Sequence, residues 1–174
     1  MLRDAYARNG RDAAVVRALA LGCLRADKAE DAEAYLNRWC DLRPAEIEPH
    51  ERRMDWNLAA NRDEQALAEG RRLLELKPDH ARARQLVAVL YVRQGRHAEA
   101  EQACRRFLQG APGTAGLIYS LAQACHGQGK DQEARTVLDS LLHQQPRHVD
   151  ALVLRATLYG EAERPPRDSR GSTT

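Results

Sequence analysis

Apolar residues recur along most of the chain at intervals of three and four, which is the spacing of one face of an α-helix. Between residues 100 and 108 the apolar positions are Ala100, Ala103, Cys104, Phe107 and Leu108. The same spacing recurs from Ala32 and from Ala134. Valine, isoleucine and threonine, which favour strands, are scarce beside alanine and leucine. The pattern therefore predicts a series of amphipathic helices rather than a sheet.

A period of 34 residues organises these helices. Four prolines fall at this interval, namely Pro44, Pro78, Pro112 and Pro146. Alanine keeps the same interval at Ala32, Ala66, Ala100 and Ala134. Because proline cannot continue the hydrogen-bond ladder of a helix, each proline should close the second helix of a unit. Each unit is therefore predicted to be an antiparallel pair of helices.

The turn between the two helices of a unit also has a recognisable composition. Gly95 and Gly129 fall in this turn, where a glycine allows the chain to reverse. Asp63 and Asp131 stand where the second helix should begin, and aspartate favours the N-cap position.

A single helix pair cannot bury its apolar stripe, so successive units should stack into a solenoid. Close approach of the helices requires small residues, which accounts for alanine at the eighth position of the units: Ala20, Ala88, Ala122 and Ala156. In these features the chain resembles the tetratricopeptide repeat family. The pairs Leu19-Ala20, Val87-Ala88 and Leu121-Ala122, the aromatics Tyr91 and Tyr159, and the set Ala100, Phe107 and Pro112 carry the resemblance. It covers residues 13–160 and implies an all-α, right-handed superhelix of four helix pairs and a C-terminal capping helix.

The period predicts the organisation of the chain. The expected segments are 1–12, the remnant of a preceding repeat helix; 13–46, 47–80, 81–114 and 115–148, the four repeats; 149–161, the capping helix; and 162–174, a disordered tail. The second repeat is degenerate, since Arg53 and Asn57 occupy apolar positions and Gly70 replaces a large residue. We expect Pro49 to shorten its first helix. This repeat is either a loosened unit or a bend or partner site.

Composition and charge exclude several classes of protein. The net charge of +2 gives no strong bias towards nucleic acid or membranes. No apolar run is long enough to span a membrane, and the first residues lack a secretory signal, so we expect a cytoplasmic location. The four cysteines form no Cys-x-x-Cys pair and should be reduced core residues. We find no catalytic, cofactor or metal motif, and we expect no enzyme activity.

The resemblance also implies a function. In the tetratricopeptide repeat family the first helices line a concave groove that meets protein ligands, and the chain is expected to act as a non-catalytic scaffold for a protein or peptide partner. The groove positions carried over to this sequence are Arg17, Arg25, Glu48, Glu51, Asp55, Arg82, Gln85, Arg93, Tyr119, Gln123 and His126. The spacing of Glu48, Glu51 and Asp55 places three carboxylates on one helix face. That face is either merely solvated or recognises a basic segment.

Two alternatives remain open at this stage. The first is a structural or assembly role, in which the chain associates with itself or with further repeats through an open N-terminal end. The second is RNA binding through Arg38, Arg72 and Arg106, which share one repeat position. Aromatic residues that could stack on bases do not interleave with these arginines, so we expect no nucleic-acid partner.

Overall fold

The structure is a computed structural model that describes residues 10–110 and 114–162. In these residues the chain forms helices and no strand. The helices are α2 (Ala13–Arg25), α3 (Ala29–Leu42), α4 (Ile47–Ala59), α5 (Asp63–Leu76), α6 (Ala81–Arg93), α7 (His97–Gly110), α8 (Ala115–Gly127), α9 (Asp131–Gln144) and α10 (Val149–Ala162). The predicted all-α fold of helix pairs is confirmed. Residues 1–9, which make up most of the predicted repeat remnant, lie outside the described residues. Pro112 and residues 163–174 of the predicted tail also lie outside them.

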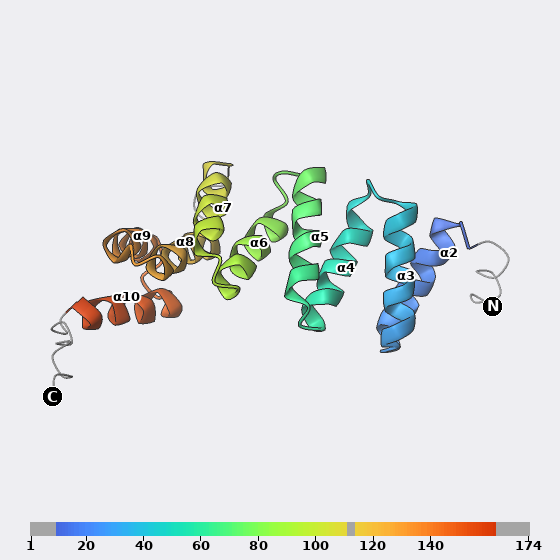
Figure 1. Cartoon of the computed structure of the whole chain (residues 1–174), viewed down its shortest axis with the longest axis horizontal. Coiled ribbons are helices and arrows are strands. Elements are labelled where there is room, and N and C mark those ends of the chain that lie inside the picture. Colours follow the sequence, from blue (N-terminus) through green and yellow to red (C-terminus); the bar gives the residue numbers. More distant parts are fainter. Residues whose placement is uncertain (1–9, 111–113, 163–174) are drawn as a thin grey trace, which may run out of the picture. The chain divides into compact units, whose positions relative to one another are not determined.

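The chain divides into two compact units, residues 1–90 and 91–174, with the boundary inside α6. In the first unit α2 packs on α3, α3 on α4, and α4 on α5 (Figure 1). One core cluster contains Val16, Ala20, Leu36 and Trp39, and a second contains Met54, Leu73 and Ala83. The apolar faces predicted from the sequence therefore meet between neighbouring helices.

In the second unit α8 packs on both α7 and α9, and α9 packs on α10. The alanines of the 34-residue period explain how the helices approach so closely. Ala100, Ala122 and Ala134 in this unit have no exposed surface, and the same holds for Ala32 and Ala66 in the first unit. A larger side chain at these positions would push the helices of a pair apart.

The turns inside the helix pairs share one backbone conformation. Gly95 and Gly129 have φ angles of +69° and +72°, as expected for glycine in a left-handed turn. Asp27 and Asn61 stand at the equivalent positions of the first two repeats and have φ angles of 52° and 55°. Asparagine and aspartate tolerate this region better than other residues with a side chain, so all four repeats turn in the same way.

The prediction that Asp63 and Asp131 are the N-caps of the second helices is wrong. Asp63 and Asp131 are the first residues of α5 and α9, and the cap positions belong to Arg62 and Lys130, whose side chains make no capping bond. The acidic side chains therefore lie in the first turn, where a negative charge favours the helix dipole.

The second repeat is more regular than expected. Pro49 lies in the first turn of α4, where backbone N–H groups have no partner in the helix. The helix α4 is therefore as long as α2, at 13 residues. The expected shortening by Pro49 is therefore wrong. Gly70 has a packing role, because a Cβ atom there would lie 2.9 Å from Cγ2 of Val87. The missing side chain lets α5 approach α6.

Candidate functional site

Ion pairs link the first helices of successive repeats in the first unit. Arg17 on α2 binds Glu48 on α4, with Nη2 3.0 Å from Oε1. Arg82 at the start of α6 binds Asp55 on α4, with Nη1 3.0 Å from Oδ2. Glu48 and Asp55 are seven residues apart and share one face of α4. Together with Glu51, these residues define what we call the first-helix surface.

Each carboxylate of the first-helix surface has a basic partner. Glu51 Oε1 accepts a hydrogen bond from Nε2 of His80 at 2.8 Å. The other ring nitrogen of His80 accepts the backbone N–H of Ala83 at 3.1 Å, which caps α6. Because Nδ1 accepts, the proton of the neutral ring lies on Nε2 and points at Glu51. The structure therefore pairs the three acidic groups with partners from the neighbouring repeats.

Arg17 is held from two sides. Its guanidinium lies 5.7 Å from the ring centroid of the buried Trp39, a cation–π distance. The hydrogen bond from Arg17 to Glu48 and the charge of Glu48 raise the pKa of Arg17 above its usual value. The side chains of this pair remain 51% and 37% exposed, so an external ligand can reach both.

The remaining predicted groove residues belong to both units. In the first unit Arg25 and Gln85 are exposed on α2 and α6. In the second unit Tyr119 packs against His148, with ring centroids 5.5 Å apart. Burial, and next the charge of Asp150, raise the pKa of Tyr119.

The other three residues also lie in the second unit. Arg93 is exposed in the last turn of α6, and Gln123 is half-buried on α8. Nδ1 of His126 lies 2.8 Å from Oδ1 of Asp131. Every predicted groove residue thus lies on one of the first helices, α2, α4, α6 or α8.

Two of the three arginines considered for RNA binding contact the protein's own backbone. Arg38 donates to the carbonyl of Gly10 at 3.4 Å, and Arg72 donates to the carbonyl of Pro44 at 3.0 Å. Both acceptors lie 28 residues earlier in the chain, so the contact repeats with the period. This arrangement gives Arg38 and Arg72 a structural role at the junctions between repeats.

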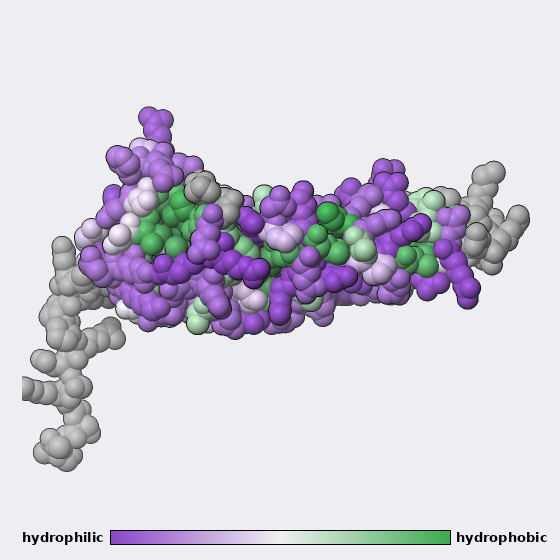
Figure 2. Space-filling model, turned by 90° about the horizontal axis from the view of Figure 1, so that it is seen from above, coloured by the Kyte–Doolittle hydropathy of each residue, from purple (hydrophilic) through white to green (hydrophobic). Residues whose placement is uncertain are grey.

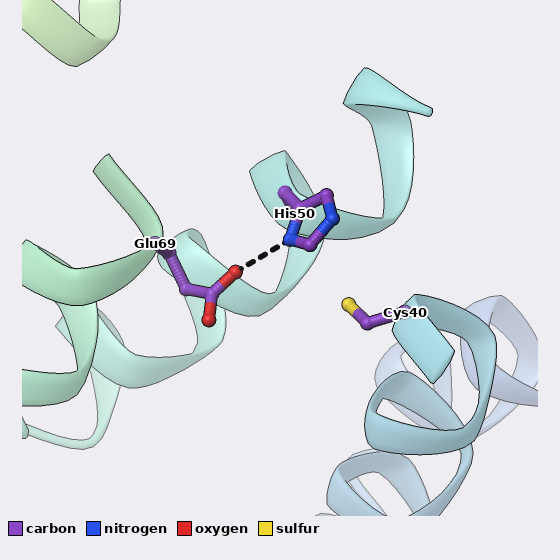
Figure 3. A group of neighbouring side chains, drawn as sticks. All are labelled: Cys40, His50 and Glu69. Carbon is purple, nitrogen blue, oxygen red and sulfur yellow. Dashed lines mark hydrogen bonds and ion pairs between the residues drawn. The ribbon is translucent and has the colours of Figure 1, made fainter. Parts of the chain in front are cut away.

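A buried polar cluster in the first unit was not predicted from the sequence. His50 and Glu69 are 4% and 8% exposed, and Nδ1 of His50 lies 2.8 Å from Oε2 of Glu69. The other carboxylate oxygen, Oε1, binds Arg53 at 2.7 Å. Burial alone would raise the pKa of Glu69, but the hydrogen bonds from His50 and Arg53 outweigh it and lower this pKa. The thiol of Cys40 lies beside the cluster (Figure 3).

A signal for this cluster was present in the sequence. His50, Arg53 and Asn57 are spaced as i, i+3 and i+7, the spacing of a core-facing helix stripe. Polar residues in such a stripe require buried partners. What the sequence could not show is that Glu69, from the following helix, supplies one.

Cys40, His50 and Glu69 are the residue types of a nucleophile, a base and an orienting acid, but the thiol is not activated. Burial raises the pKa of Cys40 to about 12, so the thiol is protonated at neutral pH. Cys40 is 3% exposed, which denies a substrate access to the sulfur. The geometry favours binding or stability over nucleophilic catalysis at this cluster.

All four cysteines are free and buried, as predicted. Burial also raises the pKa of Cys104 to about 12 and that of Cys125 to about 11. Among the described residues, no helix is both long and apolar enough to cross a membrane.

Comparison with known sequences points to one family. Two family models, both described as tetratricopeptide repeat, match residues 55–115 and residues 91–158. Together they span more than half of the 174 residues. No curated protein sequence matches the chain significantly.

Comparison with solved structures shows the fold. A MamA fragment from Desulfovibrio magneticus RS-1 is 18% identical with a TM-score of 0.75, and the match covers 87% of this chain and 85% of that one. YrrB, described as a tetratricopeptide repeat protein with an unusual peptide-binding site, is 15% identical with a TM-score of 0.72, over 94% and 84% of the two chains. The second such domain of human RPAP3, solved with an HSP70 peptide, is 17% identical with a TM-score of 0.59, over 63% and 92%.

Proposed function

The chain belongs to the tetratricopeptide repeat family, and we propose that it is a non-catalytic scaffold that binds a protein segment on its first helices. The observation that carries this proposal is the first-helix surface, where the ion pairs Arg17–Glu48 and Arg82–Asp55 link the first helices of three repeats. Two structures with the same fold are described as peptide-binding or were solved with a peptide, which supports the same use of the fold here.

The chemistry of the first-helix surface favours a ligand that carries charges of both signs. The carboxylates of Glu48 and Asp55 are already paired with arginines, so the surface is not the bare acidic face that would attract a purely basic segment. Exposed ion pairs contribute only about 0–1 kcal/mol each, so a ligand can replace them at little cost. A segment with alternating basic and acidic residues would exchange partners with both pairs.

A charge swap within one pair tests this proposal. The chain is screened against a library of random 12-residue peptides, and the peptides it selects are then measured against two variants. Arg17→Glu with Glu48→Arg keeps the internal pair and the melting temperature but reverses the charge pattern. We expect it to weaken binding at least tenfold. Arg71→Glu with Arg106→Glu changes two exposed arginines on second helices and should leave binding intact.

The outcomes distinguish peptide binding on the first helices from peptide binding on the second helices. If the charge swap binds the peptides as well as the native chain while the variant of Arg71 and Arg106 does not, the ligand uses the second helices and the proposal is wrong. Selected peptides with no charged residues would also contradict the proposed chemistry.

A role in assembly is the second candidate, because α10 has an exposed apolar face. Val149, Val153 and Tyr159 are 69%, 62% and 48% exposed, and all three lie on α10. Ala156 is also exposed, whereas the equivalent Ala122 on α8, a helix that packs on both α7 and α9, is fully buried. The exposed face is thus the one that the second helix of a further repeat would cover.

The oligomeric state tests the assembly role. Sedimentation over a wide range of protein concentration should show association of the native chain, and Val149→Ser with Val153→Ser should abolish it. A native chain that stays monomeric throughout would exclude assembly of identical copies through α10. The surface predicted for self-association at the N-terminal end falls partly on residues 1–9, outside the described part of the chain.

A further inference from the structure

Three consecutive helices of the first unit bring a thiol, an imidazole and a carboxylate together. Cys40 comes from α3, His50 from α4 and Glu69 from α5 (Figure 3). The sulfur, one ring nitrogen and one carboxylate oxygen all lie within 4.8 Å of one another, and all three residues are buried. The surface of the first unit proposed for peptide binding does not use this cluster.

The hydrogen bonds around His50 show which atoms are available to an ion. Nδ1 faces Oε2 of Glu69 at 2.8 Å, and Nε2 faces the carbonyl of Pro44 at 3.2 Å. Both partners of the ring are hydrogen-bond acceptors, a carboxylate oxygen and a backbone carbonyl. Arg53, Glu69 and Asp41 are the charged groups that act on the thiol of Cys40, which is protonated.

The outer contacts of the cluster match those of a metal site. A histidine that binds a metal commonly donates its other N–H to a backbone carbonyl, as Nε2 of His50 does to Pro44. A ligating carboxylate is commonly held by a hydrogen bond on its second oxygen, as Oε1 of Glu69 is by Arg53. Nδ1 and Oε2 therefore already point at each other with their outer partners in place.

We infer that Cys40, His50 and Glu69 bind one zinc ion through Sγ, Nδ1 and Oε2. Sulfur, imidazole nitrogen and carboxylate oxygen are the ligands that zinc takes in proteins, whereas Mg²⁺ and Ca²⁺ prefer oxygen alone. Zinc bonds of about 2.0–2.3 Å require these donor atoms to lie about 3.3–3.7 Å apart. Nδ1 and Oε2 need to separate by about half an ångström, and the sulfur needs to approach them.

The ligands of this site supply the negative charge that a zinc ion needs. Zinc binding displaces the proton of the Cys40 thiol, which passes to solvent, and leaves a thiolate. The thiolate of Cys40 and the carboxylate of Glu69 then carry two negative charges, which balance the two positive charges of the ion. An unbalanced charge on the ion would be costly in the interior.

The second unit contains a similar group that is less suited to zinc. Glu101, Cys125 and Glu133 also bring their donor atoms within 4.8 Å of one another. Glu101 binds Lys130 at 2.7 Å and Arg105 at 2.9 Å, and Arg105 also binds Glu133. Basic side chains thus bind both oxygens of Glu101, whereas Arg53 binds only one oxygen of Glu69, so the group in the second unit is a matched control.

Metal binding to the full chain tests the inference. The chain is unfolded in denaturant that contains a chelator, refolded with zinc chloride and desalted. The zinc that remains bound is then measured by mass spectrometry. We expect one zinc ion per chain in the native protein and in Cys125→Ser. Cys40→Ser and Glu69→Gln should lower zinc affinity at least tenfold, with folding checked by circular dichroism. A native chain without zinc, or zinc lost in Cys125→Ser and kept in Cys40→Ser, overturns the inference.

Cobalt substitution and proton release keep the test independent of the stability of the variants. Co²⁺ in the native chain should give the charge-transfer absorption of one thiolate ligand, and Cys125→Ser should preserve it. Zinc added at neutral pH should displace the proton of the Cys40 thiol, and an indicator dye detects its release. A spectrum without thiolate absorption, or zinc binding without proton release, contradicts the assignment of Cys40 as a ligand.

Discussion

The same glycine-to-alanine change should have opposite effects at two positions. Gly129 has a φ angle of +72°, which strains any residue with a side chain, so Gly129→Ala should lower the free energy of unfolding by about 1–2 kcal/mol. Gly22 lies inside α2, and a Cβ atom there would meet nothing within 4 Å. Gly22→Ala should therefore raise the free energy of unfolding by about 0.5–1 kcal/mol. Urea denaturation measures both, and effects of equal sign would refute the turn geometry.

The alanine ladder gives a second test at single residues. Ala100 is fully buried between helices, so Ala100→Leu should overpack the contact and cost about 1–3 kcal/mol of stability. Ala68 is exposed on α5, and Ala68→Leu should change the free energy of unfolding by less than about 0.5 kcal/mol. Thermal unfolding of the two variants checks which repeat positions face the helix contacts. Similar shifts in melting temperature for both variants would contradict this assignment.

Single residues also mark the limit of sequence reasoning. The periods of proline and alanine predicted which alanines are buried, because close helix contacts admit only small side chains. The cluster around Glu69 escaped prediction, since its members come from three different helices and packing decides which of them meet. The sequence likewise could not show that Asp27 and Asn61 adopt the turn conformation of glycine.

At the scale of elements, a network of charged groups joins α7 to the following helix pair. The carboxylate of Glu101 accepts hydrogen bonds from Lys130 and Gln128, each at 2.7 Å, and pairs with Arg105. The hydrogen bond from Lys130 is the main cause that lowers the pKa of Glu101 to about 2; burial opposes it, and the bonds from Gln128 and Arg105 add to it. Glu101 is 14% exposed, so the network is only partly screened by water.

The lowered pKa predicts the effect of acid. In the unfolded chain a glutamate titrates near about 4.3, so the contribution of Glu101 is complete above that pH and is lost as the pH falls towards 2. Glu101→Gln should cost about 1–2 kcal/mol at pH 7, after discounting for solvent, and nothing near pH 2. Urea denaturation across this pH range measures the difference.

The control for this prediction is an exposed glutamate. Glu75 pairs with Arg72 but is 66% exposed, so Glu75→Gln should change stability by less than about 0.5 kcal/mol at any pH. If Glu101→Gln loses no more stability than Glu75→Gln at pH 7, the network does not hold α7 in place.

The last helix provides a second prediction about elements. Leu158 on α10 is buried, and its carbonyl accepts a hydrogen bond from Arg135 on α9 at 2.6 Å. Truncation after His148 removes α10 and should expose Leu138 and Leu141, which are buried on α9. Light scattering should then detect aggregation.

Truncation after Ala162 is the matched control. Residues 163–174 contain no large apolar side chain, so their removal should leave the melting temperature unchanged. A chain that ends at residue 148 and remains soluble and equally stable would show that α10 does not cover α9.

At the scale of the whole molecule, the order of helices was predictable because one period governs it. The chain repeats one set of local signals, and the family matches cover more than half of it. The charge pattern of the first helices was also visible in the sequence, but its pairing was not. Whether an arginine meets a carboxylate of the next repeat depends on how the helices stack. Figure 2 shows groups of hydrophobic residues among the hydrophilic side chains that predominate on this face.

Hydrogen exchange with a selected peptide tests the central claim most directly, because it locates the ligand without a mutation. Backbone amides of the chain are followed by mass spectrometry with and without the peptide. The account predicts that protection on binding concentrates in α2, α4 and the start of α6, which carry the first-helix surface. Protection confined to the second helices α3 and α5 would contradict it.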